Sequence, residues 1–235
     1  DLKAAGIAAK QAEIPHIVYR RGSAIPIQNR WHNRFLFKQV ITEIIANSQA
    51  TKESILQKNL NLFPAEKIAV IYNGFDFEAF ENLPNQPIFQ RKADELILGN
   101  AGRLARQKGQ QDLIDLSLKL QKRNIPHRIL IAGSGPLEQQ LKKYAHQKNA
   151  ENHVIFLGFQ KNIRAFMESI DVLALPSRWE GFGYVLVEAM AAEKPALAYR
   201  LSSNSELIQD GENGFLAEPF NIEMLAEKAS LLYRQ

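Results

Sequence analysis

Two glutamates and two glycines share one short segment of the sequence. Glu180 precedes Gly181 and Gly183, and Glu188 follows inside a helix predicted for residues 184–192. Glycines at the turn leave the amides of the helix start free to face a ligand. A buried carboxylate needs hydrogen-bond donors, which the hydroxyl groups of a ligand can supply. The alternative is that Glu188 only complements the helix dipole.

A basic loop, residues 102–109, follows a strand predicted for residues 96–101. Arg103 and Lys108 lie where the strand leads into the next helix, and free amides and the helix dipole favour an anion there. Two permanent cations suit a diphosphate, since Arg grips two oxygens and Lys adds a mobile point charge. The alternative is a solvated basic loop, and Arg106 is expected to be plain surface.

Two further loops follow predicted strands. Gly133 and Gly135 permit a close approach of the backbone to a ligand, although a simple tight turn explains them equally well. The segment lacks the third glycine of a dinucleotide-binding fingerprint, which argues against a nicotinamide-dependent dehydrogenase. Gly158 and Phe159 by themselves indicate only the end of a strand.

The elements that position these loops alternate between strand and helix. Strands are predicted for residues 14–19, 43–47, 68–72, 96–101, 128–132, 154–157, 172–175, 196–199 and 214–217, and helices for residues 1–11, 29–41, 48–58, 110–123, 184–192 and the stretch ending near residue 233. Such alternation predicts an α/β fold with doubly wound parallel sheets. Because ligands bind beyond the carboxyl ends of parallel strands, these loops are expected to share one edge.

The segment 77–93 contains Pro84 and Pro87 and has no sustained periodicity, so it is predicted to connect two domains, residues 1–76 and 94–235. The chain begins without Met inside a predicted helix and ends in another. It is therefore expected to be a fragment.

Composition limits the possible functions. Of the 235 residues, 46% are hydrophobic and 23% charged, as in an ordinary globular protein, and the absence of cysteine excludes disulfides and thiolate metal sites. No apolar run approaches the roughly 20 residues of a membrane span. The net charge of +4 favours anionic partners.

The spacing of Glu180 and Glu188 matches the E-x7-E signature of retaining GT-B glycosyltransferases of family 4, also called glycosyl transferases group 1. Other segments occur in the order typical of that family: residues 71–76, 102–109, 132–136, 156–158 and 210–216. The resemblance covers roughly residues 43–217 and is specific, because many motifs occur together.

The resemblance implies a GT-B fold with two Rossmann-like domains. Residues 1–76 would be part of the acceptor-side domain, and residues 94–235 the nucleotide-sugar-binding domain without its last helices. The implied activity is retaining, metal-independent transfer of a sugar from a UDP-, GDP- or ADP-sugar to a glycan or lipid-linked acceptor. Neither a metal nor a cofactor is expected, and nucleic acid is not an expected partner. A bacterial surface polysaccharide or lipopolysaccharide pathway would suit such a cytoplasmic enzyme, which would act near the inner face of the membrane.

The resemblance also assigns roles to individual residues. Arg103 and Lys108 would neutralise the donor diphosphate, Glu180 would position the transferred sugar, and Glu188 would bind the ribose. The remaining donor-binding residues would be Gly135, Phe159, Phe182, Gly183, Tyr184 and Val185.

Some family features are missing from the N-terminal part. It has no glycine-rich loop, and the five histidines show no acceptor-binding pattern and are expected to be surface or structural. The alternative function is therefore a non-catalytic nucleotide-sugar-binding or interaction domain.

A basic, aromatic stretch at residues 30–38, with Arg20 and Arg21 before it, permits peripheral contact with an anionic membrane. The sequence favours the alternative, a helix whose aromatic side chains pack inward.

Overall fold

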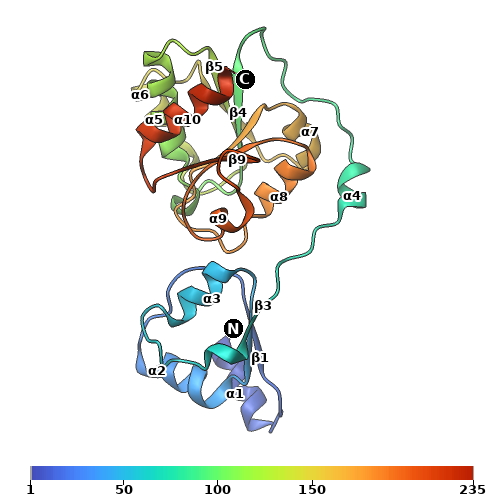
Figure 1. The fold of residues 1–235 in the computed structure, drawn as a ribbon, viewed down its shortest axis with the longest axis vertical. Coiled ribbons are helices and arrows are strands. Elements are labelled where there is room, and N and C mark those ends of the chain that lie inside the picture. Colours follow the sequence, from blue (N-terminus) through green and yellow to red (C-terminus); the bar gives the residue numbers. More distant parts are fainter. Residues whose placement is uncertain (1, 235) are drawn as a thin grey trace. The chain divides into compact units, whose positions relative to one another are not determined.

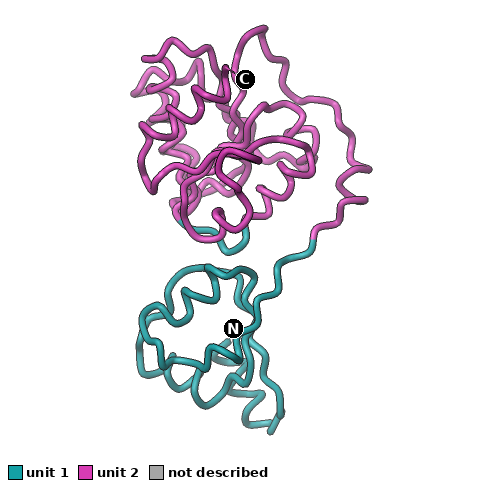
Figure 2. The backbone as a smooth tube through the Cα atoms, viewed as in Figure 1, with its two compact units in different colours: residues 1–74, 179–182 teal, residues 75–178, 183–235 magenta. Residues whose placement is uncertain are grey.

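The computed structural model describes residues 2–234, which divide into two compact units. Unit 1 comprises the chain up to Gly74 together with Trp179–Phe182, and unit 2 comprises Phe75–Arg178 and the chain from Gly183 onward (Figure 2). The segment predicted as a connector belongs to unit 2, where its first residues form the short helix α4 (Phe77–Glu81). The Asp76 side chain caps this helix by accepting a hydrogen bond of 2.9 Å from the amide of Ala79.

Unit 1 contains a three-stranded parallel sheet in the order β1-β2-β3. Its strands are β1 (Val18–Arg21), β2 (Glu43–Ala46) and β3 (Ile68–Val70). The first strand begins later than predicted, beyond Pro15, which has no amide hydrogen to give to a strand partner.

The helices of unit 1 are α1 (Leu2–Gln11), α2 (Trp31–Phe35), a π-helical turn (Leu36–Val40), α3 (Gln49–Leu56) and a 3-10 turn (Ala65–Lys67). Asp1, the first residue of the predicted first helix, lies outside the described residues. Ser48 caps α3 as expected, since its hydroxyl oxygen accepts a hydrogen bond of 3.0 Å from the amide of Thr51.

The aromatic residues of α2 and the turn after it do not all face the core. Leu36 and Phe37 are buried, but Trp31 is 74% exposed and Phe35 is 44% exposed. The expectation of an inward-packed aromatic stretch is therefore wrong for Trp31 and Phe35. A short α-helix continued by a π-turn does not keep the helical period that the expectation assumed.

Unit 2 contains a six-stranded parallel sheet in the order β6-β5-β4-β7-β8-β9. Its strands are β4 (Leu96–Ala101), β5 (His127–Ala132), β6 (Val154–Gly158), β7 (Val172–Leu175), β8 (Ala196–Tyr199) and β9 (Gly214–Ala217). This is the doubly wound arrangement predicted, with the strand order reversing between β4 and β7. The carboxyl end of that junction is where such sheets bind ligands.

Helices cover both faces of this sheet (Figure 1). On one face lie α5 (Gln110–Lys122), α6 (Glu138–Gln147) and α10 (Ile222–Tyr233), and on the other α7 (Ile163–Glu168) and α8 (Tyr184–Ala191), with the short α9 (Asn204–Leu207) after β8. Each face has its own buried core, one around Leu113 and Ile129 and the other around Phe166 and Leu173. In the described part of the chain, no helix has the length and apolarity that crossing a membrane requires.

Candidate functional site

A cavity of about 680 Å³ lies at the carboxyl end of the sheet in unit 2. We call it the unit 2 cavity. It is lined by Ala101, Gly102, Arg103, Ala132, Gly133, Ser134, Gly135, Pro136, Phe159, Gln160, Lys161, Ile163 and Glu188. These residues come from the last residues of β4 and β5, from the loops after β4, β5 and β6, from the start of α7, and from α8. The volume is that of a small-molecule site, and the position is the one expected of a doubly wound sheet.

The loops after β4 and β5 pack backbone against backbone. A Cβ atom at Gly133, where φ is +137°, would lie 1.9 Å from the carbonyl oxygen of Gly102, and one at Gly135 would lie 2.4 Å from the carbonyl oxygen of Leu104. The amide of Leu104 donates a hydrogen bond of 3.0 Å to the carbonyl of Ser134. Both glycines are therefore required by the neighbouring loop. Gly135 also lines the cavity, but the space of its missing side chain is filled by protein.

Arg103 lies on the loop after β4, with its exposed side chain at the cavity. Its carbonyl oxygen accepts a hydrogen bond of 3.0 Å from the side-chain amide of Gln110, which is 1% exposed. The amide group of Gln110 also lies 3.4 Å from the side-chain oxygen of Asn100 in β4. The backbone that carries the arginine is thus fixed while the guanidinium remains accessible.

Lys108 ends a 3-10 turn (Arg106–Lys108) that precedes α5. Its side chain crosses Gly102, where a Cβ atom would lie 3.3 Å from the Cε atom of the lysine. Burial raises the pKa of the half-buried Glu188, and the positive charge of Lys108 partly offsets this rise. Unit 2 therefore brings Arg103, Lys108 and Glu188 together at one edge of its sheet.

Glu180 lies on the segment Trp179–Phe182, which belongs to unit 1 and has the colour of that unit in Figure 2. It is 5% exposed. The carbonyl of Gly181 accepts a hydrogen bond of 3.3 Å from the hydroxyl of Thr51, and the ring of Phe182 lies 6.1 Å from that of Tyr72. These contacts hold the backbone directly after Glu180, whose contribution to a donor site stays a prediction.

The start of α8 has the glycine-opened form expected from the sequence. Gly183 has a φ of +83° and precedes the first helical residue, Tyr184, which is exposed, whereas Val185 is buried. The described residues that line the unit 2 cavity include none of these three, nor Phe182. The donor-binding role predicted for their amides is supported only by the resemblance.

The sequence interpretation missed part of the lining. Phe159 is 75% exposed and lines the cavity, and its donor-binding role stays a prediction; Gln160 and Lys161 beside it were not singled out. Ile163 was missed as well, whereas Ser134 and Pro136 belong to the segment 132–136 that the sequence singled out without giving these two residues a ligand role. The signal was present, because every loop that follows a strand of a parallel sheet lies at the same edge. Lys161 adds another cation to the cavity.

Metal ligands do not cluster in the described chain. No group of three or more His, Cys, Asp or Glu side chains among residues 2–234 is arranged to hold a metal ion.

Comparisons with known proteins bear on the family and the fold of the chain. The family described as "Glycosyl transferases group 1" matches residues 84–235. An uncharacterized glycosyltransferase of Methanocaldococcus jannaschii is 34% identical over 221 residues, covering 92% of this chain and 57% of that protein. The UDP-Gal:alpha-D-GlcNAc-diphosphoundecaprenol alpha-1,3-galactosyltransferase of Escherichia coli is 28% identical over 234 residues, covering 92% of this chain and 60% of that enzyme.

Among solved structures, the crystal structure of Anabaena HepE in complex with UDP and glucose superposes with a TM-score of 0.78 at 29% identity, covering 98% of this chain and 65% of that one. The chain thus spans less than two thirds of each of these three proteins. The predicted α/β fold of the GT-B type is confirmed by this likeness and by the parallel sheets of both units. Because the family match extends over more than half of the sequence, the chain belongs to the glycosyl transferases of group 1.

Proposed function

We propose that the protein transfers a sugar from a nucleoside-diphosphate sugar, and that the unit 2 cavity binds the nucleotide and its diphosphate. The observation that carries the proposal is the convergence of Arg103, Lys108 and Glu188 at the carboxyl edge of one sheet. The HepE structure holds UDP and glucose, and the name of the Escherichia coli relative specifies a UDP-sugar. A UDP-sugar is therefore the first donor to test, with GDP- and ADP-sugars as the alternatives.

The chemistry requires stabilisation of a leaving group. When the bond between the sugar carbon and the phosphate oxygen breaks, negative charge grows on the departing diphosphate while the sugar becomes oxocarbenium-like. Cations fixed beside that charge stabilise the transition state more than the bound substrate. Arg103 and Lys108 are suited to this role, and we propose that the transfer needs no metal and retains the anomeric configuration, as the resemblance implies.

The other groups of the cavity suit the nucleoside. The Glu188 carboxylate can accept hydrogen bonds from ribose hydroxyls, which would compensate for its burial. Phe159 offers an exposed ring at the cavity, which Gly135 also lines. Glu180 is proposed to position hydroxyl groups of the transferred sugar, so Glu180→Gln should reduce transfer more than it reduces UDP binding.

Calorimetric titration with UDP, GDP and ADP tests the nucleotide site. Arg103→Ala removes a charge-assisted contact of about 1.5–3 kcal/mol, so affinity for the preferred nucleotide should fall about 10- to 100-fold. Arg106→Ala is the matched control, since Arg106 is exposed and lies in the same basic loop but is not among the lining residues described. If the wild type and Arg103→Ala had equal affinity for all three nucleotides, the proposed nucleotide site would be contradicted.

The acceptor is proposed to be a glycan or a lipid-linked sugar of a bacterial surface polysaccharide. The support is the name of the Escherichia coli relative, whose acceptor is a diphosphoundecaprenol-linked sugar. Transfer of labelled galactose from UDP-galactose to GlcNAc-diphosphoundecaprenol is the direct assay. Tight UDP binding with neither transfer to acceptors nor donor hydrolysis would instead favour a non-catalytic binding domain.

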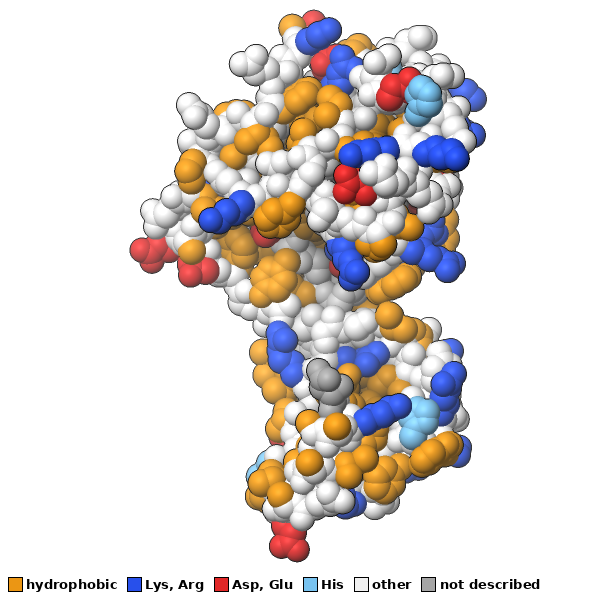
Figure 3. Space-filling view, turned by 180° about the vertical axis from the view of Figure 1, so that it is seen from behind, with side chains coloured by type: hydrophobic (Ala, Val, Ile, Leu, Met, Phe, Trp, Pro, Cys, Tyr) orange, Lys and Arg blue, Asp and Glu red, His pale blue; other side chains and the backbone are white. Residues whose placement is uncertain are grey.

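We further propose that unit 1 contacts an anionic membrane through α2 and its surroundings. Trp31 and Phe35 are exposed, and the ammonium of Lys10 lies 5.8 Å from the centre of the Phe35 ring. Desolvation, followed by the positive charges of Lys3 and Arg30, lowers the pKa of His32. Figure 3 shows Lys, Arg and His side chains interspersed with hydrophobic ones on the displayed face of this unit. Exposed aromatics among cations suit the interface of anionic lipids.

Sedimentation with vesicles tests this contact. The protein should bind vesicles that contain phosphatidylglycerol and not vesicles of phosphatidylcholine alone, and Trp31→Ala should weaken that binding. The control is Phe77→Ala, which removes an exposed aromatic ring in unit 2 rather than in unit 1 and should bind vesicles as the wild type does. Equal binding by Trp31→Ala and the wild type would contradict a membrane role for this face.

A further inference from the structure

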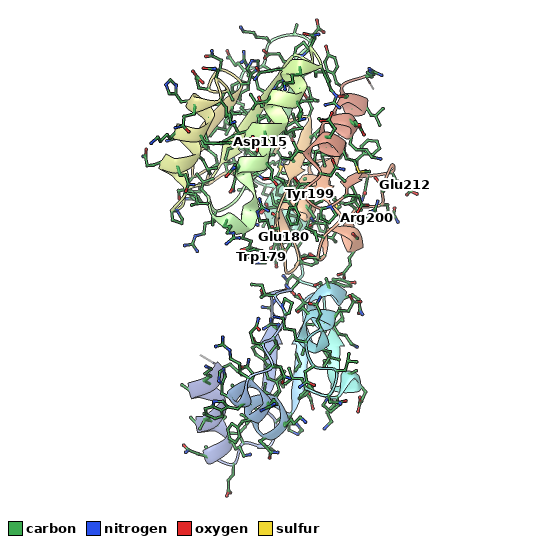
Figure 4. The ribbon with its side chains drawn as sticks, turned by 90° about the vertical axis from the view of Figure 1, so that its left-hand side faces the viewer. Asp115, Trp179, Glu180, Tyr199, Arg200 and Glu212 are labelled. Carbon is green, nitrogen blue, oxygen red and sulfur yellow. The ribbon has the colours of Figure 1, made fainter. Side chains whose placement is uncertain are left out.

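A buried charged network lies at the start of α5, outside the residues described as lining the unit 2 cavity. Asp112, in the first turn of α5, is 6% exposed. Its Oδ2 atom accepts a hydrogen bond of 2.9 Å from the hydroxyl of Tyr199, and its Oδ1 atom accepts one of 3.2 Å from the guanidinium of Arg178. Tyr199, labelled in Figure 4, ends β8 and is 0% exposed. We call these three residues the Asp112 network.

The network joins the loop after β7 to the turn that carries Lys108. The backbone amide of Arg178 donates a hydrogen bond of 2.7 Å to the carbonyl of Gln107. On the other side of Lys108, a Cβ atom at Gly109 would lie 2.1 Å from the carbonyl oxygen of Pro176. The residues that flank Lys108 are therefore both held directly against the loop after β7.

Contacts with Phe220 and with one another restrain the members of the network. The guanidinium of Arg178 lies 4.9 Å from the centre of the Phe220 ring, and Phe220 also packs edge-on against Tyr199. Burial raises the pKa of Asp112, and the hydrogen bond from Tyr199 and the charge of Arg178 oppose that rise. Removing one partner would leave a buried carboxylate poorly compensated, which strongly favours local rearrangement of the first turn of α5.

We infer that the Asp112 network is a positioning device for Lys108. It fixes the turn between β4 and α5 so that the lysine crosses Gly102 and remains beside Glu188, where it faces the diphosphate. The inference rests on the proposed function. Its support is that an ion pair whose carboxylate is buried contributes little to stability compared with apolar packing, whereas a point charge must be placed to within about 1 Å to act on a ligand.

A double-mutant cycle on UDP binding tests the inference. The variants are Arg178→Met, Lys108→Met and the combination, measured by calorimetry on the full chain. Arg178→Met should weaken UDP binding about tenfold when Lys108 is present, in keeping with the loss of one charge-assisted contact. It should have less than about a twofold effect when Lys108 is already absent, because residues that act through one another are not additive. Arg178→Lys keeps the charge and should recover part of the affinity.

The control is Arg128→Met. Arg128 forms an ion pair of 3.1 Å with Glu95 in the same unit, and its side chain is 19% exposed against 33% for Arg178. This change should lower the melting temperature without altering the affinity for UDP.

The outcomes separate the inference from the proposed function. If Arg178→Met reduces the affinity for UDP equally with Lys108 present and with Lys108 replaced by Met, or in neither case, the positioning role is overturned. The proposed nucleotide site is unaffected by either result. If the wild type binds GDP or ADP instead of UDP, the cycle is run with that nucleotide. If it binds none of the three, the proposed function fails, and this inference fails with it.

Discussion

At the scale of single residues, the cavity depends on the balance of charge around Glu188. Its carboxyl group is half-buried, and Lys108 is the cation whose charge opposes the effect of burial on its pKa. Arg103 and Lys161 line the same cavity. An excess of positive charge near a half-buried acid is what a site for a sugar diphosphate requires, because the ligand brings its own negative charge.

Lys108→Met should therefore raise the pKa of Glu188 further, because it removes the opposing positive charge. The titration of the Glu188 carboxyl carbon by NMR measures this, with Glu188→Gln to assign the signal. Lys161→Met is the control, since Lys161 is among the residues described as lining the cavity but is not among the groups that shift this pKa. If the pKa of Glu188 rose more in the Lys161 variant than in the Lys108 variant, the assignment of Lys108 as the cation beside Glu188 would be wrong.

His127 is a structural histidine, as expected of the histidines in general, and it is deeply buried. Its two ring nitrogens lie 2.8 Å from the hydroxyl of Ser117 and 2.8 Å from the carbonyl of Ile125, and its ring stacks on that of His153. It is 1% exposed, and burial is the main cause that lowers its pKa to about 4. The neutral form therefore belongs to the folded state.

The free energy of unfolding should fall as the pH drops below the pKa of His127 in the unfolded chain. Its folded pKa of about 4 lies below the unfolded value of about 6.5, so protons favour the unfolded chain. The contribution is fully present above about pH 6.5 and is lost at about 1.4 kcal/mol per pH unit down to about pH 4, some 3 kcal/mol in all.

Urea unfolding at about pH 7 and about pH 5 measures this effect, which corresponds to about 2 kcal/mol over that interval. His127→Gln should be less stable at the higher pH but should lose less stability on acidification. His146→Gln, whose imidazole is exposed, should behave as the wild type does. If the stability of His127→Gln and that of the wild type depended on pH in the same way, His127 would not be the group responsible for the loss of stability.

At the scale of elements, the junction between β4 and α5 has a strict backbone requirement. Gly109 has a φ of +65° and precedes the first residue of α5. The carbonyl of Pro176 occupies the position that a side chain would need. The turn with Lys108 and the loop after β7 can therefore approach each other only because residue 109 has no Cβ atom.

Gly109→Ala should lower the free energy of unfolding by clearly more than the cost of about 1 kcal/mol for alanine in a left-handed conformation. Gly211→Ala is the matched control, since Gly211 also has a positive φ, +89°, but has nothing within 4 Å of an added Cβ atom. Differential scanning calorimetry compares the two variants. Equal losses would mean that the contact with Pro176 is not tight.

At the scale of the whole molecule, the chain consists of two units with separate hydrophobic cores. The core of unit 1 gathers around Ile44 and Phe37, whereas unit 2 has a core on each face of its sheet. The chain returns to unit 1 for Trp179–Phe182, the segment that carries Glu180. The unit 2 cavity is built by residues of unit 2 alone, so nucleotide binding is expected to be a property of that unit.

Hydrogen exchange in the presence of UDP should reflect this division. Amides in residues 102–109, 132–136 and 158–163 should exchange more slowly with UDP, because binding stabilises the folded state locally. Amides of β1 to β3 should change much less. Arg103→Ala at the same UDP concentration is the control and should show weaker protection. If UDP slowed exchange only in residues 2–70, the nucleotide would bind to unit 1 and the proposed site in unit 2 would be wrong.

The sequence by itself determined the parallel α/β class and most of the elements of unit 2. The strands predicted for residues 96–101, 172–175, 196–199 and 214–217 have the observed bounds, because short apolar runs buried in a doubly wound sheet are distinct from the amphipathic helices between them. It also indicated Arg103, Lys108 and Glu188, because each lies in a loop or helix that directly follows a strand.

Only the tertiary structure decided how these segments meet. It placed Glu180 on a segment that packs with unit 1, filled the space beside Gly133 and Gly135 with a neighbouring loop, and left Trp31 exposed. It also joined Asp112 to partners 66 and 87 residues away in the sequence. Local pattern fixes which residues leave a strand, but contacts between distant segments depend on packing, which periodicity and spacing do not encode.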